Sequence, residues 1–254
     1  MMRGAVTFVL LAAACAALMA SVRATDARAD GYKYALQYFT NNPEYWGERG
    51  YFVTMNPSLS DVNHQHSLSN LYIATEPEFW LPDAAFPWVE MGYYKGHSQN
   101  AGYCGSTPRV FVGTSDDGTW ENYVEFDYNT LGIGSVHKFG ISRTDHDPST
   151  GDTEWTFYLD GDVTKTCWRS RPDQGHPSAG GEIWRYSGDY SWPEMLAHGR
   201  SNGSGISNRL CIKESDGTWS EWDTTYTSRW DFYQSSGTTF TTLTPKYSSF
   251  NCTD

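Results

Sequence analysis

Basic residues and long apolar runs are both scarce in this chain. Its 254 residues include 18 Lys and Arg against 30 Asp and Glu, which gives a formal net charge of −12. A nucleic-acid binder that neutralises phosphates needs a basic surface, so this balance excludes that class. It also argues against attraction to an anionic membrane surface. Beyond residue 20 no apolar run approaches the length that spans a bilayer, so we expect no membrane span.

Several catalytic and cofactor motifs are also missing. The chain has no Gly-x-Ser-x-Gly elbow for a serine hydrolase and no glycine pattern for binding dinucleotides or phosphates. It has no closely spaced cysteine pairs of the kind that hold zinc. We therefore expect no cofactor and no metal. Aromatic residues, by contrast, are abundant, with 11 Trp, 17 Tyr and 12 Phe. Such a content is typical of a folded chain, because disordered acidic chains contain few aromatics.

The N-terminus has the pattern of a secretory signal. A short basic start, Met1-Met2-Arg3, precedes the apolar run Ala5–Ala20, and Ala27-Arg28-Ala29 offers a small-x-Ala cleavage site. We predict a signal peptide over 1–29, a single domain over 30–254, and a secreted, extracellular protein. The alternatives are an uncleaved anchor and lipidation at Cys15.

Four cysteines remain after the predicted cleavage: Cys104, Cys167, Cys211 and Cys252. An even number in a secreted chain indicates two disulfides, and four cysteines allow three connectivities. We favour pairing 104 with 167 and 211 with 252.

Short runs of β-branched and aromatic residues dominate, and Gly, Pro, Asn and Asp separate them. The predicted strands are Tyr51–Met55, Leu68–Ala74, Trp88–Lys95, Arg109–Gly113, Trp120–Asp127, Val136–Arg143, Glu154–Leu159, Val163–Trp168, Gly181–Ser187, Asn208–Lys213, Arg229–Tyr233 and Phe240–Leu243. Turn signals of the Asp-Gly type occur at 117–118, 160–161 and 216–217, the second closing a tight hairpin. Without helical periodicity or alternation of strands and helices, the chain is predicted to be all-β. We expect an antiparallel two-sheet β-sandwich of the jelly-roll, concanavalin-like type.

Two glutamates occupy unusual positions among aromatic residues. In Trp88–Tyr94, alternation places Glu90 on the face of Trp88 and Tyr94, and places Val89, Met91 and Tyr93 on the opposite, core-like face. In Gly181–Tyr186, Glu182 likewise shares a face with Trp184 and Tyr186. Burial there would raise a carboxyl pKa, and two such groups can divide the acid and base roles of hydrolysis. On the alternation alone, we favour the interpretation that each is a solvated strand glutamate with aromatic neighbours.

Four motifs occur in order along the chain: Gly50–Asn56, His66–Ile73 with its Ser67-Leu68-Ser69, Val89–Tyr93 and Gly180–Ile183. Over residues 48–187 this order resembles the catalytic domain of the neprosin family of glutamic peptidases and, more distantly, the jelly-roll eqolisins. The resemblance implies a peptide or protein substrate and two catalytic glutamates, which fall on Glu90 and Glu182.

From this resemblance we predict a secreted glutamic endopeptidase whose two glutamates activate water. Its optimum would be acidic because one carboxyl must be neutral. The flanking aromatics Trp88, Tyr94, Trp184 and Tyr186 would line the substrate cleft. The alternative is a non-catalytic jelly roll that binds carbohydrate or another surface, because aromatic faces also stack on sugar rings.

Three weaker patterns are also present. Tyr123, Glu125 and Asp127 share one strand face, as the carboxylates of jelly-roll glucanases do, but Thr130 stands where a further glutamate would be needed. A glycosidase is therefore a third hypothesis. The sequence Asp145-His146-Asp147 with Asp152 contains calcium-type ligands, although Pro148 and Gly151 favour an ordinary turn. His64 and His66 would need a third ligand to hold a metal, and we interpret them as polar residues leading into a strand.

Overall fold

The computed structural model describes residues 31–39, 44–75, 86–98, 103–116, 122–126, 132–186, 193, 195–198, 210–222, 227–231, 240–243 and 252. The predicted signal peptide lies outside these residues. For β1, β6, β11, β14 and β15 the backbone alone is described. The described part is all-β, and no helix in it is long and apolar enough to cross a membrane.

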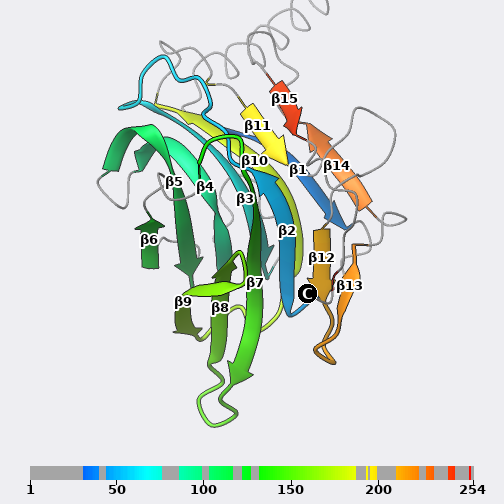
Figure 1. Ribbon diagram of the computed structural model, residues 1–254. Coiled ribbons are helices and arrows are strands. Elements are labelled where there is room, and N and C mark those ends of the chain that lie inside the picture. The colour runs from blue at the N-terminus through cyan, green and yellow to red at the C-terminus, as the bar shows by residue number, and fades with distance from the viewer. Residues whose placement is uncertain are drawn as a thin grey trace, which may run out of the picture.

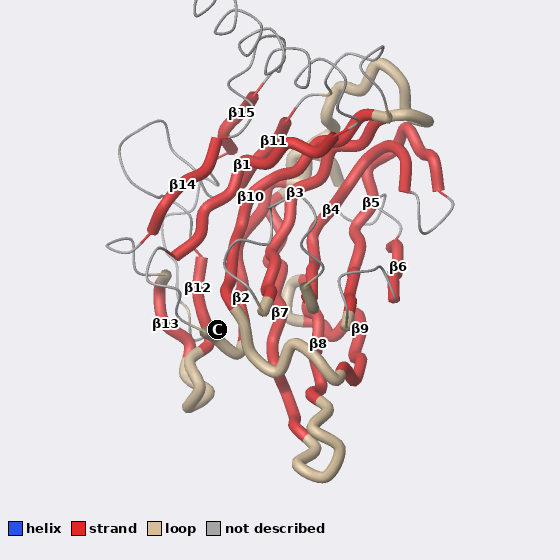
Figure 2. The backbone as a smooth tube through the Cα atoms, turned by 180° about the vertical axis from the view of Figure 1, so that it is seen from behind, coloured by secondary structure: helices blue, strands red, loops and turns tan. Residues whose placement is uncertain are grey.

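Two antiparallel sheets lie one over the other (Figure 1). The larger sheet contains, in spatial order, β14 (Thr227–Asp231), β1 (Gly31–Phe39), β10 (His176–Arg185), β3 (Gln65–Ala74), β4 (Trp88–Ser98), β5 (Tyr103–Ser115) and β6 (Asn122–Phe126). The smaller sheet contains β13 (Trp219–Glu221), β12 (Leu210–Lys213), β2 (Gly47–Val53), β7 (Val136–His146), β8 (Thr153–Leu159) and β9 (Asp162–Arg169). Seen from behind, the larger sheet forms a continuous layer across the molecule (Figure 2). The predicted two-sheet antiparallel β-sandwich is confirmed.

A short parallel pair, β11 (Met195–His198) with β15 (Phe240–Leu243), departs from the antiparallel pattern. Each predicted strand coincides with an observed one, with identical ends for Phe240–Leu243 and shifted ends for the others. Three strands were missed, namely β1, β11 and β13. The prediction also placed the start of β2 four residues too late, because Gly47-Glu48-Arg49-Gly50 has low strand propensity. Pairing with β7 and β12 on both sides overrides that propensity.

The turn at Asp160-Gly161 closes the β8–β9 hairpin as predicted. Leu159 pairs with Asp162, and both turn residues have positive φ, 54° at Asp160 and 95° at Gly161. Type I′ turns require this geometry at both central positions. Gly217, with φ of 86°, lies in the turn between β12 and β13. The turn predicted at 117–118 lies outside the described residues.

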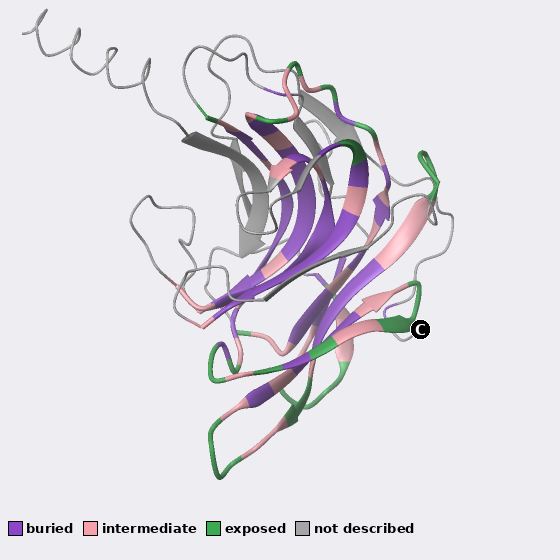
Figure 3. Ribbon diagram, turned by 90° about the vertical axis from the view of Figure 1, so that its left-hand side faces the viewer, coloured by how far each residue is buried: buried purple, intermediate pink, exposed green. Residues whose placement is uncertain are grey.

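The core lies between the two sheets, and Figure 3 shows burial concentrated in the middle of the strands. Its main buried side chains are Leu71, Ile73, Val89, Met91, Val110 and Val112 from the larger sheet, and Phe52, Phe139, Ile141, Trp155, Phe157 and Ile212 from the smaller. Two aromatic residues with polar ends also lie there. Tyr93 donates its hydroxyl to the carbonyl of Val53 at 2.9 Å, and the Trp155 indole donates to the carbonyl of Pro172 at 2.7 Å. The Tyr93 hydroxyl and the Trp155 indole N–H are therefore both buried with a hydrogen-bond partner.

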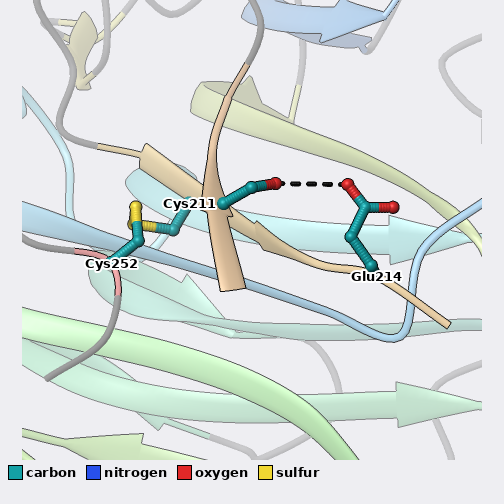
Figure 4. The surroundings of a disulfide bond; sticks show 4 residues. Cys211, Glu214 and Cys252 are labelled. Carbon is teal, nitrogen blue, oxygen red and sulfur yellow. Dashed lines mark hydrogen bonds between the residues drawn. A yellow bond between two sulfur atoms is a disulfide. The ribbon is translucent and has the colours of Figure 1, made fainter. Parts of the chain in front are cut away.

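The predicted disulfide Cys211–Cys252 is confirmed (Figure 4). The disulfide links Cys211 of the buried strand β12 to Cys252, 41 positions further along the chain. The α-carbons of the two cysteines lie 5.8 Å apart. Glu214, which follows β12, accepts a hydrogen bond of 3.1 Å from the Ser220 hydroxyl of β13. The predicted Cys104–Cys167 pair is wrong. Cys167 is a free thiol on the core face of β9 in the smaller sheet, whereas Cys104 lies on β5 in the larger sheet, opposite His97 of β4.

Replacing Cys211 and Cys252 by serine should destabilise the fold. A cross-link that closes a loop of this size restricts the unfolded chain by about 4 kcal/mol on the chain-entropy estimate. Urea unfolding of the oxidised protein should therefore show a clearly lower midpoint in the double serine variant. Adding reductant should lower the wild-type midpoint and leave that of the variant unchanged. Equal midpoints for the oxidised wild type and the variant would contradict a stabilising cross-link.

Candidate functional site

The alternation predicted for β4 is present in the structure. Val89, Met91 and Tyr93 belong to the core between the sheets, whereas Glu90 lies on the opposite face of the larger sheet. Glu90 is nevertheless only 3% exposed. The interpretation of Glu90 as a solvated strand glutamate is therefore wrong, because its carboxyl is removed from water although it does not face the main core.

Glu182 lies on the same sheet face as Glu90. Strand β3 separates β10 from β4, and the register pairs Glu182 with Leu68 and Glu90 with Tyr72. The two glutamates are thus two strands apart and offset by four residues. With the usual strand spacing and rise, their α-carbons lie roughly 16 Å apart. A bound ligand that contacts both carboxyls must lie diagonally across β3.

Burial dominates the electrostatics of Glu90. Loss of water around the carboxyl raises the pKa of Glu90 well above its ordinary value. The negative charge of Glu182 raises the pKa of Glu90 further, and the hydrogen bond from the Asn70 amide nitrogen opposes these effects. Glu90 is therefore a neutral carboxylic acid at pH values where ordinary glutamates are ionised.

Glu182 has a different partner, a histidine of the central strand. His66 Nε2 lies 2.8 Å from Glu182 Oε1, and His66 Nδ1 lies 3.2 Å from the carbonyl of His97. A carbonyl only accepts, so Nδ1 carries a proton. The Nε2 contact then needs a second proton, on either His66 or Glu182. The Glu182–His66 pair can thus hold one exchangeable proton, which is what a group that accepts and returns protons requires.

Aromatic rings surround both glutamates. Trp184 is 5% exposed and stacks against the rings of His66 and His97, with centroid separations of 5.5 and 5.6 Å. At the other end of this face, Trp88 stacks on Tyr72 with a centroid separation of 5.6 Å. These rings, rather than charged groups, form much of the surroundings of the two carboxyls.

The other two aromatics of the predicted cleft differ in exposure. Tyr94 is buried and packs with Leu68 and Phe111 in a small cluster on this face. Tyr186 lies just past the end of β10 and is 57% exposed, in edge contact with Trp184. A direct ligand contact is therefore open to Tyr186, whereas Tyr94 supports the sheet face from within.

Asn70, at the centre of this face, was not singled out by the sequence analysis. It pairs with Gly180 of β10 on one side and Gly92 of β4 on the other, so neither same-face neighbour carries a side chain. A Cβ at Gly92 would lie 2.0 Å from the carbonyl oxygen of Ser69, so only glycine fits this close approach of β4 to β3. The signal that identifies Asn70 is alternation along β3, which puts His66, Asn70 and Tyr72 on one face.

Glu48 is a further buried carboxyl that no sequence pattern indicated. Its side chain points into the core from β2, beside Ile141 and Ile212 in the register, and is 0% exposed. One carboxyl oxygen accepts a hydrogen bond of 3.3 Å from the backbone nitrogen of Tyr72. Burial raises the pKa of Glu48 well above its ordinary value, so burial favours the neutral form of this carboxyl. The charged residue interrupts the apolar pattern of β2, which is why the prediction excluded it.

The remaining candidates do not converge on this face. Asp147 accepts hydrogen bonds from the backbone nitrogen and hydroxyl of Ser149, at 2.8 and 2.6 Å, and closes the β7–β8 turn. His64 contacts Asp61 at 2.9 Å. The side chains of Tyr123, Glu125 and Asp127 lie outside the described residues. Within the described ranges no group of three His, Cys, Asp or Glu side chains is arranged to hold a metal ion.

No protein-family model and no curated protein matches the chain. Among solved structures it is similar to a β-glucanase of Bacillus licheniformis, with 15% identity over 57% of this chain and 55% of that chain and a TM-score of 0.33. It is also similar to a β-1,3-1,4-glucanase from a mouse hindgut metagenome (13% identity, 62% and 68% coverage, TM-score 0.36) and to sheep galectin-11 (10%, 62% and 90%, TM-score 0.31). The chain thus spans little more than half of the first glucanase. At these scores the likenesses support no argument about function, and the fold rests on the sheet topology described above.

Replacing Glu48 by glutamine should stabilise the protein at neutral pH. The pKa of Glu48 is raised in the folded state, so as pH increases the unfolded chain ionises first, near its ordinary pKa of about 4.3. As pH rises from the pKa of Glu48 in the unfolded chain to its higher pKa in the folded protein, the free energy of unfolding decreases. Glutamine removes this loss, and a gain on the order of 1 kcal/mol corresponds to about 2–4 °C for a chain of this size.

Thermal unfolding at pH 4 and pH 7 measures this effect. The advantage of Glu48→Gln over wild type should be larger at pH 7 than at pH 4, whereas the exposed control Glu221→Gln should show no such difference. An advantage that shrinks as pH rises would show that Glu48 is ionised and stabilising in the fold.

Proposed function

We propose that this protein is a secreted hydrolase that cleaves peptide bonds with two glutamates as acid and base. The observation that carries the proposal is the buried Glu90, whose pKa burial raises, on the same sheet face as Glu182, whose carboxyl lies 2.8 Å from His66 Nε2. Hydrolysis near neutral or acidic pH requires one group that donates a proton and another that accepts one. The motif order that resembles neprosin-type glutamic peptidases supports a peptide substrate, and the predicted signal peptide supports an extracellular location.

In this mechanism Glu90 is the acid and Glu182 is the base. A bound peptide lies across β3 with its scissile carbonyl between the two carboxyls. Glu182 takes a proton from water as the water oxygen bonds to the carbonyl carbon, and Glu90 donates its proton to the carbonyl oxygen, which gives a neutral tetrahedral intermediate. When the C–N bond breaks, Glu182 returns its proton to the amine and Glu90 recovers its own from the hydroxyl. Every proton is thus accounted for without a cofactor.

Glu90→Gln and Glu182→Gln should each reduce kcat/KM on an unstructured protein such as casein by about 10²–10⁴-fold, the usual contribution of a general acid or base. Wild-type activity should be highest at acidic pH and should fall as pH rises through the raised pKa of Glu90, because that group loses its proton. Glu221→Gln, which changes an exposed glutamate of β13, is the matched control. Near-wild-type turnover in either site variant would remove that glutamate from the mechanism.

A second candidate, carbohydrate recognition without catalysis, is supported by the rings at the end of this face. Tyr186 is exposed and lies edge-on to Trp184, which stacks on His66 and His97, and exposed aromatic faces also bind sugar rings. A hydrolase that uses its carboxyls on a glycosidic bond is the related possibility.

If the protein binds glycans, Tyr186→Ala should weaken binding roughly 2- to 12-fold, as loss of one ring contact of 0.5–1.5 kcal/mol implies. Trp168→Ala is the matched control, because Trp168 is 45% exposed on β9 of the other sheet. Glycan-array signals that depend on Tyr186, without casein cleavage between pH 3 and 7, would favour this candidate over the peptidase. Equal weakening by both variants would exclude the stack as the glycan site.

A further inference from the structure

Two buried polar atoms on the outer face of the larger sheet have no hydrogen-bond partner within the part of the chain that the structure describes. They are Oδ1 of Asn70 on β3 and Oγ of Ser178 on β10, and the two residues are 4% and 1% exposed. Folded proteins pair nearly all buried polar atoms, because an unpaired one forfeits its hydrogen bonds to water. Two such atoms on the face that carries both glutamates therefore call for an explanation.

The register places these two residues beside each other. Asn70 pairs with Gly180, and Tyr72 pairs with Ser178, so Asn70 and Ser178 are diagonal neighbours across the β3–β10 pairing. Diagonal neighbours in an antiparallel pair share a face and lie roughly 7–8 Å apart. The positions directly beside Asn70, Gly180 on β10 and Gly92 on β4, carry no side chain that could pair with its oxygen.

The hydrogen bond to Glu90 determines which end of the Asn70 amide is unpaired. The amide nitrogen donates to Glu90 Oε1, so the oxygen is the atom without a partner among the residues described. A carboxyl oxygen can accept this bond whether or not the carboxyl is protonated, so the orientation holds in both states. Asn70 Oδ1 only accepts, whereas the Ser178 hydroxyl can also donate. Together they complement the N–H and C=O groups of a peptide backbone.

Asn70 lies midway between the two proposed catalytic glutamates. Glu90 pairs with Tyr72 and Glu182 pairs with Leu68, so Asn70 is the same-face residue of β3 between these two levels. A peptide that reaches both carboxyls therefore passes over Asn70. The unpaired acceptor is thus placed where the backbone of such a peptide would lie.

We propose that Asn70 and Ser178 bind the backbone of the peptide substrate: Asn70 Oδ1 accepts a hydrogen bond from one peptide N–H, and the Ser178 hydroxyl donates one to a peptide carbonyl. This inference rests on the proposed function, because it takes the ligand to be a peptide. It makes the site selective for a substrate residue that has a backbone N–H at the position over Asn70. Proline, which lacks that N–H, is disfavoured there.

Urea unfolding tests whether the Ser178 hydroxyl is unpaired in the protein without substrate. Ser178→Ala removes a buried hydroxyl that has no partner among the described residues, so it should leave the midpoint unchanged or raise it. Ser69→Ala is the matched control, because Ser69 is as fully buried and its hydroxyl donates to the carbonyl of Gly180 at 2.9 Å. That control should lower the midpoint. An equal fall in both variants would show that the Ser178 hydroxyl serves the fold, and would overturn the proposal.

Backbone esters test the contact with Asn70. A peptide that the wild type cleaves is prepared with each amide in turn replaced by an ester, which removes one N–H. Binding is measured to Glu182→Gln, which should hold the peptide without turnover. One ester should bind about 5- to 150-fold more weakly, as an unpaired buried acceptor implies. Adding Asn70→Ala should abolish this difference, and adding Ser69→Ala should preserve it.

Ser178→Ala provides a second measurement that does not depend on whether Asn70→Ala folds. Combined with Glu182→Gln, it should weaken binding of the unmodified peptide by about 2- to 12-fold, the usual effect of one hydrogen bond, and Ser69→Ala should not. Equal binding of all the esters, or unchanged binding in Ser178→Ala, overturns the proposal while peptide cleavage by the wild type leaves the proposed function intact. Absence of cleavage by the wild type would instead overturn the proposed function, and this inference with it.

Discussion

The site depends on the removal of one carboxyl from water. Glu90 belongs to a strand whose other face builds the main core, so the sheet fixes its backbone, and aromatic residues on its own face exclude solvent. Desolvation destabilises the charged form, and the nearby charge of Glu182 adds to this effect. A carboxyl with a raised pKa, on the same sheet face as a second, differently partnered carboxyl, is the physical basis of the proposed chemistry.

Polar groups whose burial destabilises the fold lie on both faces of the larger sheet. Glu48 is a second carboxyl with a raised pKa, buried in the core, and it accepts a hydrogen bond from the backbone nitrogen of Tyr72 behind the site. Asn70 leaves a buried oxygen unpaired among the described residues. Proteins keep such unfavourable features where function requires them, and here they gather on and behind β3, between the two glutamates.

Alternation along β4 and β10 was enough to predict that Glu90 and Glu182 lie apart from the core among aromatics. The same period-2 pattern predicted the strands and the two-sheet class. The strand order was not predictable, because it depends on pairing between segments far apart in the chain. Without it, neither the position of β3 between the glutamates nor the contact of His66 with Glu182, 116 residues away, could be inferred.

Local composition predicted the wrong structure at positions where contacts between distant segments determine it. Gly47–Gly50 resembles a loop and yet forms part of β2, and the cysteine count suggested two disulfides, although Cys167 packs as a free thiol in the core. The most direct test of the neutral Glu90 is a ¹³C titration of its side-chain carboxyl, with the signal assigned through Glu90→Gln. The structure predicts a midpoint well above the ordinary glutamate value of about 4.3. A midpoint at or below that value would contradict a neutral Glu90 and the mechanism built on it.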